Sequence, residues 1–291
     1  MRVGEVGLET LEARLRVMLP EIYREREEAV RPESMGSAGL RFGVDGRVAW
    51  DEIWGSFCDL AMAGGPPHKG TLLEPGSGQA IGAEGQRYGE VVEEICRGVG
   101  LVTGLWVEDS EDAGWVRMYC TSAAMAGWLA RAIVMENVCA RAQGLVLYLP
   151  AGPAYRVEKE IKNVVTAVAK TCHYWVEHTP VEQQWEIGRV LREMEAESAL
   201  VEPGMSDTLL RERVGSAIEG ATGLVCSAHG YAGWVGLECG AVAAAIWMMR
   251  VLVVSNVFAR REGTMVFVPV DERVVGVVAR VAGLGRMRGI Y

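Results

Sequence analysis

The sequence predicts an α+β protein in which two tandem ferredoxin-like (βαββαβ) repeats form a pseudo-twofold pair, preceded by an N-terminal helical extension. Three observations support this prediction. The 291 residues are 50% hydrophobic, which is enough apolar material for a large folded core. Two stretches of the chain match each other at one constant offset. Within both stretches, segments with strand and helix periodicity occur in the same order.

The repeat is clearest where TGLWVEDSEDAGWVRMYC (residues 103–120) aligns without a gap with TGLVCSAHGYAGWVGLEC (residues 222–239). The match continues at the same offset through the pairs Trp115/Trp234, Cys120/Cys239, Trp128/Trp247, Arg131/Arg250, Asn137/Asn256, Arg141/Arg260, Gly144/Gly263 and Pro150/Pro269. Large side chains cannot move within a close-packed core at low cost, so the shared positions indicate equivalent packing environments.

Each repeat begins with a short apolar strand (71–73 and 199–201) that ends at Glu-Pro-Gly, because proline cannot donate a ladder hydrogen bond. An amphipathic helix follows (86–98 and 206–219). Next come two strands joined by a polar hairpin (101–107 with 115–120, and 221–226 with 234–239). A long apolar helix (121–142 and 240–261) then leads to the last strand, LVLYLP or MVFVPV.

This order divides the chain into four segments. Residues 1–70 form the extension, with a charged amphipathic helix (6–30), a glycine-rich stretch and a second helix from Asp51. Residues 71–156 form the first repeat, residues 157–198 two connecting helices that break near Pro180, and residues 199–291 the second repeat.

Composition and charge exclude several classes of protein. The 38 acidic and 29 basic side chains give a net charge of -9, which argues against a nucleic-acid partner held by neutralised phosphates. The most apolar stretch, 241–254, contains Arg250 and is shorter than the roughly 20 residues that span a bilayer. The seven cysteines are scattered without a CxxC pair, which favours a reducing compartment. We therefore expect a cytoplasmic protein without a membrane partner.

The string GGPPHKG (residues 64–70) carries the first catalytic candidates, His68 and Lys69. The two prolines stiffen this loop and the glycines allow close approach, so an imidazole and an ammonium would be held for acid–base work or for clamping an anion. The second repeat has no counterpart, so this loop would mark a single active face. A turn with solvent-facing polar side chains is the alternative.

Glu74 is the third catalytic candidate. Glu74 and Glu202 end the first strand of each repeat, where α+β folds commonly place ligands, and together they could contribute two carboxylates to one site. A structural role in the turns before Pro75 and Pro203 is the alternative.

The helix predicted over 157–177 carries three of the four lysines of the chain. Helical spacing places its basic side chains on one face, and a basic stripe on an acidic protein would attract an anionic ligand. The expected ligand-binding residues are Arg156, near the start of the helix, with Lys159, Lys162, Lys170 and His173. A solvated helix face is the alternative.

Cys226, His229 and Cys239 have the side chains of a metal site, but the first repeat lacks the matching set and a fourth ligand is missing. We expect no metal. Cys120 and Cys239 directly precede apolar helices, and their duplication favours a packing role. No Walker, GxGxxG, GxSxG or HExxH motif points to a cofactor or an enzyme class.

Two functional hypotheses follow. The first is a cytoplasmic enzyme or cofactor-handling protein that acts on a small anionic molecule in a cleft between the two duplicated units. The second is a non-catalytic assembly or regulatory protein that pairs with a partner, or with a second copy in a homo-oligomer, through its edge strands and N-terminal helix.

Overall fold

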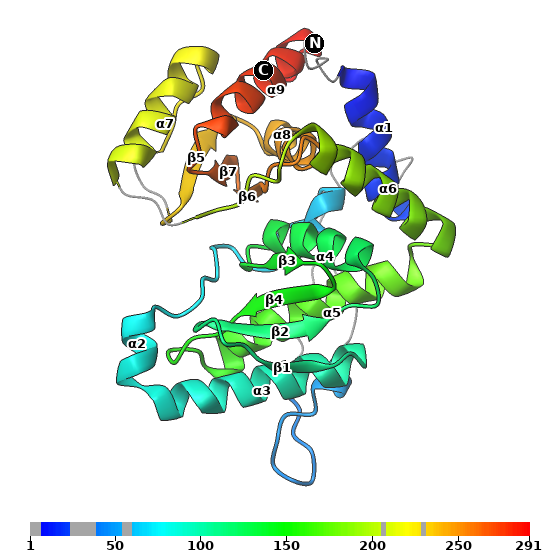
Figure 1. Cartoon of the computed structure of the whole chain (residues 1–291), viewed down its shortest axis with the longest axis vertical. Helices are drawn as coiled ribbons and strands as arrows, with labels where there is room; N and C mark the ends of the chain where they lie inside the picture. The colour runs from blue at the N-terminus through cyan, green and yellow to red at the C-terminus, as the bar shows by residue number, and fades with distance from the viewer. Residues whose placement is uncertain (1–6, 24–38, 54–59, 205–207, 228–230) are drawn as a thin grey trace. The chain divides into compact units, whose positions relative to one another are not determined.

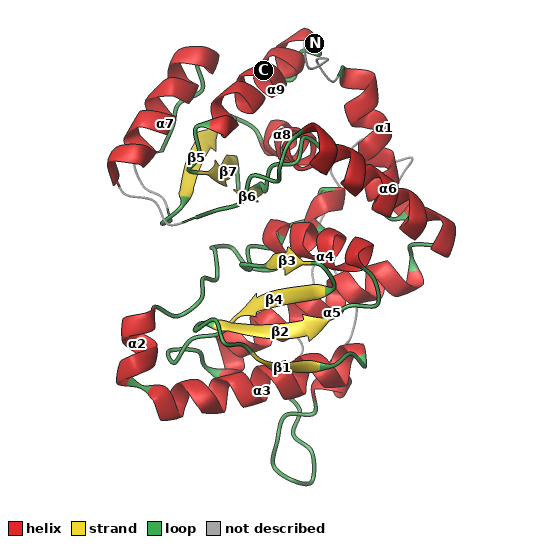
Figure 2. Cartoon of the chain, viewed as in Figure 1, coloured by secondary structure: helices red, strands yellow, loops and turns green. Residues whose placement is uncertain are grey.

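The computed structural model describes residues 7–23, 39–53, 60–204, 208–227 and 231–291. The chain forms two compact units: unit 1 consists of residues 1–29 and 185–291, and unit 2 of residues 30–184. Both units contain helices and an antiparallel sheet (Figures 1 and 2), which confirms the α+β class. No helix in the described part of the chain is long and apolar enough to cross a membrane.

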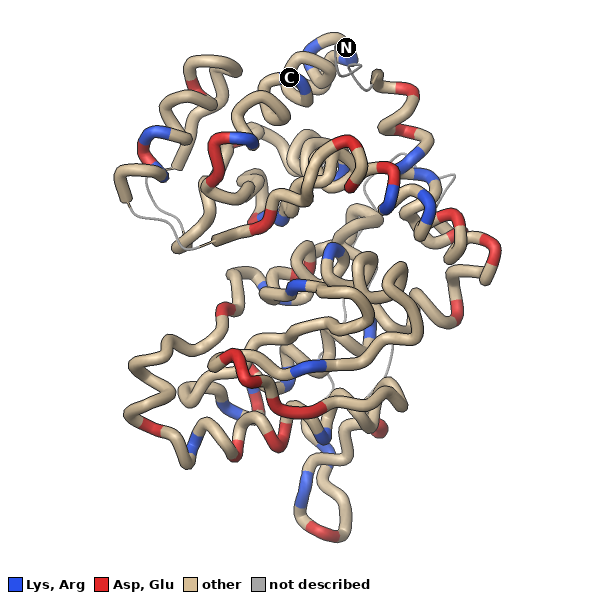
Figure 3. The backbone as a smooth tube through the Cα atoms, viewed as in Figure 1, with Lys and Arg blue, Asp and Glu red and all other residues tan. Residues whose placement is uncertain are grey.

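Unit 2 contains a four-stranded sheet with the order β1-β2-β4-β3. Its strands are β1 (Val107–Asp109), β2 (Trp115–Tyr119), β3 (Arg141–Gln143) and β4 (Val146–Pro150), and every neighbouring pair is antiparallel. One hairpin joins β1 to β2 and another joins β3 to β4. The hairpin between β1 and β2 is densely acidic (Figure 3).

The sheet of unit 2 has one buried face and one half-exposed face, because side chains alternate along a strand. The buried face consists of Val116, Met118, Leu147 and Leu149, all fully buried. The helices α3 (Gly85–Thr103) and α4 (Ala123–Met135) contact the sheet, and the helix α5 (Lys162–Glu177) packs against both of them. The short helices η2 (Trp50–Glu52), η3 (Ala61–Ala63) and α2 (Gly78–Ala83) precede α3, and the π-helical turn η4 (Val157–Ile161) leads into α5.

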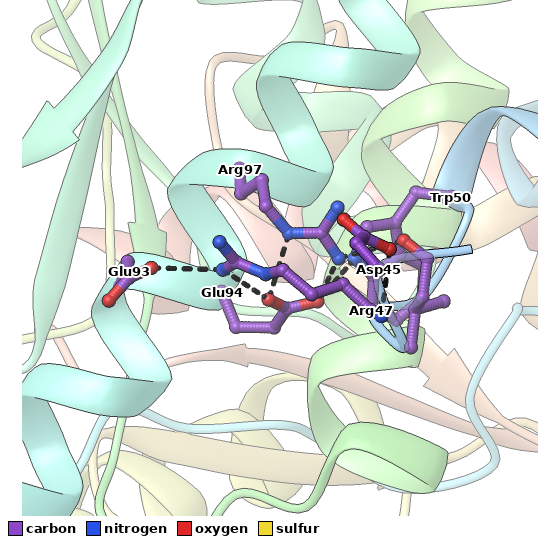
Figure 4. A network of polar contacts seen from close by, with 7 residues as sticks. Asp45, Arg47, Trp50, Glu93, Glu94 and Arg97 are labelled. Atoms are coloured by element: carbon purple, nitrogen blue, oxygen red, sulfur yellow. Dashed lines mark hydrogen bonds and ion pairs between the residues drawn. The ribbon is translucent and has the colours of Figure 1, made fainter. Parts of the chain in front are cut away.

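A polar network fixes residues 45–50 to the helix α3 (Figure 4). The Glu94 carboxylate accepts hydrogen bonds from Trp50 Nε1 at 2.7 Å, from Arg47 at 3.1 Å and from Arg97 at 2.5 Å. Burial by itself raises the pKa of Glu94. The three donors lower this pKa by a larger amount, so it lies below its ordinary value. Glu94 therefore stays charged at neutral pH and holds the residues before η3 in place.

Unit 1 contains a three-stranded sheet with the order β5-β7-β6. Its strands are β5 (Trp234–Glu238), β6 (Arg260–Glu262) and β7 (Met265–Pro269), and its helices are α7 (Thr208–Thr222), α8 (Val242–Val253) and α9 (Arg273–Met287). A further bridge joins Cys226 to Leu237. Each unit therefore has the order helix, two strand segments, helix, hairpin, helix.

The N-terminal helix is shorter than the sequence predicts. The helix α1 spans Leu8–Met18 and ends before Pro20, and the short helix η1 covers Glu21–Tyr23. The buried Arg14 forms an ion pair at 2.5 Å with Glu197, the last residue of α6 (Val181–Glu197). This helix is thus packed inside unit 1. Most of the helix predicted from Asp51 lies outside the described residues.

The C-terminal ends predicted for the long apolar helices over 121–142 and 240–261 are wrong. The helices stop at Met135 and Val253, because Asn137 and Asn256 adopt left-handed backbone angles with φ of 62° and 60°. The chain then turns back into the hairpins β3–β4 and β6–β7, which the prediction of a single last strand omitted.

The first strand predicted for each repeat is also reduced. It contributes one parallel bridge in each unit, between Leu73 and Val138 and between Val201 and Val257. Both sheets are instead built from hairpins whose strands pair antiparallel. The break predicted near Pro180 is confirmed, because α5 ends at Glu177 and α6 begins at Val181.

Candidate functional site

Among the described residues of unit 2, the most buried charged group is the Glu136 carboxylate, at the end of α4. Its Oε2 accepts hydrogen bonds from Lys170 Nζ at 2.8 Å and from the His68 backbone N–H at 2.6 Å. Its Oε1 accepts one from the Ala61 N–H at 2.9 Å. Both charged side chains are at most 1% exposed. A buried charge requires hydrogen-bonding partners, and Glu136 takes them from Lys170 in α5 and from the backbone of the GGPPHKG loop. The ion pair therefore fixes this loop to α4 and α5.

His68 and Lys170, two of the predicted site residues, therefore meet around a residue that the sequence analysis missed. Glu136 stands in an otherwise apolar run, as does Lys170. The sequence offered one signal for this pair. A single acidic residue in one apolar helix and a lysine within an apolar stretch of another indicate an ion pair between the helices, because each charge needs a buried partner. In unit 1 the position that matches Glu136 is Ser255, whose Oγ donates to the Val251 carbonyl at 2.8 Å.

The His68 imidazole is half-buried beside the Lys170 ammonium. Burial and, next, the Lys170 charge lower the pKa of His68 to about 4. The ring is therefore neutral at pH 7. A neutral imidazole can accept a proton, but it is neither a general acid nor a cation for an anion clamp at that pH.

Lys69, Lys159 and Arg156 are grouped around the Glu160 carboxylate. Arg156 Nε lies 3.5 Å and Lys159 Nζ 3.7 Å from Glu160, and both cations are more than half exposed. Burial lowers the pKa of Lys69, while Glu160 raises it and Lys159 lowers it, so these charges lie close enough to interact. This cation group has three positive charges around one carboxylate.

Glu74 is exposed and contributes its backbone to the structure. The Tyr155 hydroxyl donates to the Glu74 carbonyl at 2.5 Å. Burial, with smaller effects from Cys139, Glu160 and Glu74, raises the pKa of Tyr155 well above its ordinary value, so its hydroxyl stays protonated.

The predicted basic stripe of α5 is interrupted. Lys162 is half-exposed, but Lys170 is buried in its ion pair with Glu136. His173, farther along the helix, lies beside His178. Because each residue advances a helix by about 1.5 Å, His173 is separated from Lys159 by roughly 20 Å and belongs to a different part of unit 2.

The thiols of Cys226 and Cys239, which belong to the metal hypothesis, and the thiol of Cys120 are protonated at neutral pH. Burial raises the pKa of Cys226 and of Cys239 to about 11, and that of Cys120 to about 12. His229 lies outside the described residues. Among the described residues no three His, Cys, Asp or Glu side chains are grouped as metal ligands.

An arginine stacked on aromatic rings occurs at the same repeat position in both units. In unit 2 the Arg141 guanidinium lies 4.8 Å from the Trp115 ring centroid and 4.5 Å from that of Tyr148. In unit 1 the Arg260 guanidinium lies 5.0 Å from the ring of Trp234 and 4.1 Å from that of Phe267. Sequence alignment paired these residues, but only the sheet register brings them together as cation–π contacts.

An apolar pocket of 190 Å³ lies at the C-terminal ends of α3 and α5. It is lined by Thr103, Leu105, Thr121, Met125, Cys172, Trp175, Val176 and Gln184, all from unit 2. The sequence analysis missed it, because its lining comes from four separate segments.

Three polar side chains that line this pocket donate hydrogen bonds within the chain. The Thr103 hydroxyl donates to the Val99 carbonyl at 2.7 Å, and the Thr121 hydroxyl to Met125 Sδ at 3.4 Å. Gln184 Nε2 donates to the carbonyls of Trp175 and Thr179. Burial raises the pKa of the Cys172 thiol, which keeps it uncharged. The pocket therefore suits an apolar group.

Comparison with models of protein families, with curated proteins and with solved structures finds no match for this chain.

Proposed function

We propose that the protein is a non-catalytic binding protein and that the apolar pocket of unit 2 anchors one apolar side chain of a partner polypeptide. The observation that carries this proposal is the pocket itself. Its 190 Å³ is below the roughly 300–1,000 Å³ of small-molecule and cofactor sites. It matches one large apolar side chain.

Exposed apolar residues next to the pocket support a protein partner. Val176 lines the pocket and is 64% exposed, and Trp106, which follows the lining residue Leu105, is 69% exposed. Aromatic side chains such as Trp106 are enriched where proteins bind one another, and exposed apolar patches mark such surfaces. Glu177 and Glu182 are exposed and lie close in sequence to the lining residues Val176 and Gln184. Their charges would favour a partner with basic residues beside the apolar side chain that enters the pocket.

The edge strands of unit 2 are poorly suited to pairing with a partner strand, which favours binding at the apolar pocket. The outer strands β1 and β3 of unit 2 are three residues long and carry Glu108, Asp109 and Arg141. Short, charged edges oppose strand addition. The N-terminal helix is packed in unit 1 through Leu11, Arg14 and Met18.

The test uses a fluorescein-labelled peptide in which one phenylalanine lies between two lysines on each side. We expect Val176→Asp to weaken binding of this peptide by roughly tenfold or more, because the new carboxylate removes the benefit of burying the phenyl ring. Fluorescence anisotropy measures the affinity.

Val44→Asp is the matched control, because Val44 is a fully exposed valine of the same unit away from the pocket. It should bind the peptide as the wild type does. Equal affinity for a peptide with alanine in place of phenylalanine, or no binding at millimolar concentration, would contradict the proposal.

A second candidate function is the handling of a small anionic molecule at the cation group Lys69, Lys159 and Arg156. Its support is the excess of positive charge there and the exposure of Lys159 and Arg156. If it is correct, inorganic phosphate should bind saturably, and Lys69→Ala with Lys159→Ala should weaken binding by roughly tenfold or more, since charge-assisted hydrogen bonds are lost. Calorimetric titration measures this, with Arg213→Ala in unit 1 as the control. Affinity unchanged by the paired substitution would eliminate this candidate.

We further propose that the two units arose by duplication and that the protein acts in the cytoplasm. The duplication is supported by the matched left-handed asparagines, Asn137 and Asn256. Each donates from Nδ2, at 2.8 Å, to a backbone carbonyl near the bridging residue: Asn137 to that of Lys69, four residues before Leu73, and Asn256 to that of Ser198, three residues before Val201. The scattered, protonated thiols support a reducing compartment.

A further inference from the structure

Two of the four histidines of the chain meet at the C-terminal end of α5. His173 Nε2 and His178 Nε2 lie 3.3 Å apart, and the ring planes are inclined by 77° with their centroids 5.0 Å apart. Both side chains are half-buried, so one side of the pair is accessible.

The surroundings hold both rings in this position. The buried Tyr174 ring lies 5.7 Å from the ring of His173 and 5.2 Å from that of His178. His178 and Thr179 form the turn that follows α5. The Tyr174 carbonyl fixes this turn, because it accepts hydrogen bonds from the His178 N–H at 3.1 Å and from the Thr179 hydroxyl at 2.9 Å. The geometry of the pair is therefore preorganised.

The spacing of the two nitrogens matches that of two ligands on one metal ion. Imidazole nitrogens bind Zn²⁺ at roughly 2.0–2.1 Å, and two such ligands at a tetrahedral angle are separated by about 3.3 Å. We infer that His173 and His178 form a binding site for a divalent transition-metal ion of the class that imidazole prefers, such as Zn²⁺, Ni²⁺ or Cu²⁺.

The surroundings of the pair suit a cation, because the Glu177 carboxylate lies close enough to His173 to interact with it electrostatically. Metal binding needs both Nε2 lone pairs. The ring that donates Nε2–H to the other must move that proton to Nδ1, which gives the second neutral tautomer without net loss of a proton.

Two protein ligands leave coordination positions open. Among the described residues no third histidine, cysteine or carboxylate joins this pair as a metal-ligand group. Water, or a donor from another molecule, would complete the coordination. The two histidines are not among the residues that line the apolar pocket, so the inference is independent of the proposed partner binding.

The test is a calorimetric titration of the full chain, first stripped with EDTA, with NiCl₂ alone. We expect one saturable site, and a loss of affinity of at least about tenfold in both His173→Asn and His178→Asn. His178→Asn keeps the fold in place, because His178 is the half-exposed C-cap residue of α5 and asparagine is tolerated at helix ends. His229→Ala is the control and should keep the wild-type affinity.

Proton NMR supplies a second readout that a general loss of stability would not reproduce. Substoichiometric Ni²⁺ should broaden the ring resonances of His173 and His178 before those of His68 and His229. Unchanged affinity in His178→Asn, or first broadening at another histidine, would overturn the inference.

Discussion

Replacing Glu136 by glutamine is expected to destabilise unit 2 by about 3–5 kcal/mol, because it leaves the Lys170 ammonium buried without a countercharge. Lys170→Met should have an effect of the same order, since the carboxylate would then be buried with only two backbone donors. The double substitution should cost less than the sum of the two, because it removes both charges. Urea denaturation together with hydrogen exchange at the Ala61 and His68 amides measures these effects.

Glu90→Gln in α3 of the same unit is the control for this prediction. Glu90 forms an ion pair with Arg87 at 3.1 Å, but both side chains are about half exposed, so its removal should cost at most about 1 kcal/mol. Equal, small effects of Glu136→Gln and Glu90→Gln would show that the Glu136–Lys170 pair does not hold the GGPPHKG loop.

Trp234→Ala should destabilise unit 1 by about 3–5 kcal/mol, because it leaves a cavity in a packed core. Trp234 is 1% exposed and also carries the stacked Arg260, which is fully buried. The matching Trp115 of unit 2 is half-exposed, so Trp115→Ala should cost less, about 1–2 kcal/mol.

Because the two units need not unfold together, the Trp234 and Trp115 effects are best read from hydrogen exchange of the β5–β7 and β2–β4 amides separately. Equal losses at the two tryptophans would mean that their burial differs less than the structure indicates.

The sequence predicted most of the helices and the strands β2, β4, β5 and β7 from periodicity, because these depend on local apolar patterns such as that of Trp115 to Cys120. It did not predict the short strands β3 and β6. It misplaced the ends of the apolar helices. Asn137 and Asn256 directly follow Glu136 and Ser255 at the end of largely apolar stretches, and this local pattern does not distinguish a helix that ends there from one that continues. Their role depends on carbonyls far away in the sequence, those of Lys69 and Ser198.

The candidate sites were less predictable than the fold. The sequence singled out His68 and Lys170 separately, but it did not single out Glu136, which joins them and lies at the end of a largely apolar helix. The pairing of His173 with His178 required the turn at the end of α5, which rotates His178 out of helical spacing. Contacts between distant segments decide such sites, and periodicity within one segment does not report them.

The most direct test of the proposed partner binding is methyl NMR of Met125, which lines the apolar pocket and is 2% exposed. Labelled methionine methyl groups would be followed as the peptide with one phenylalanine between lysines is added, and Met125→Leu would assign the signal. The proposed function predicts a saturable shift of the Met125 resonance with the phenylalanine peptide, little shift with the alanine peptide, and no shift at Met62 in η3. A Met125 resonance that stays unchanged at saturating peptide, or one that moves equally with both peptides, would contradict it.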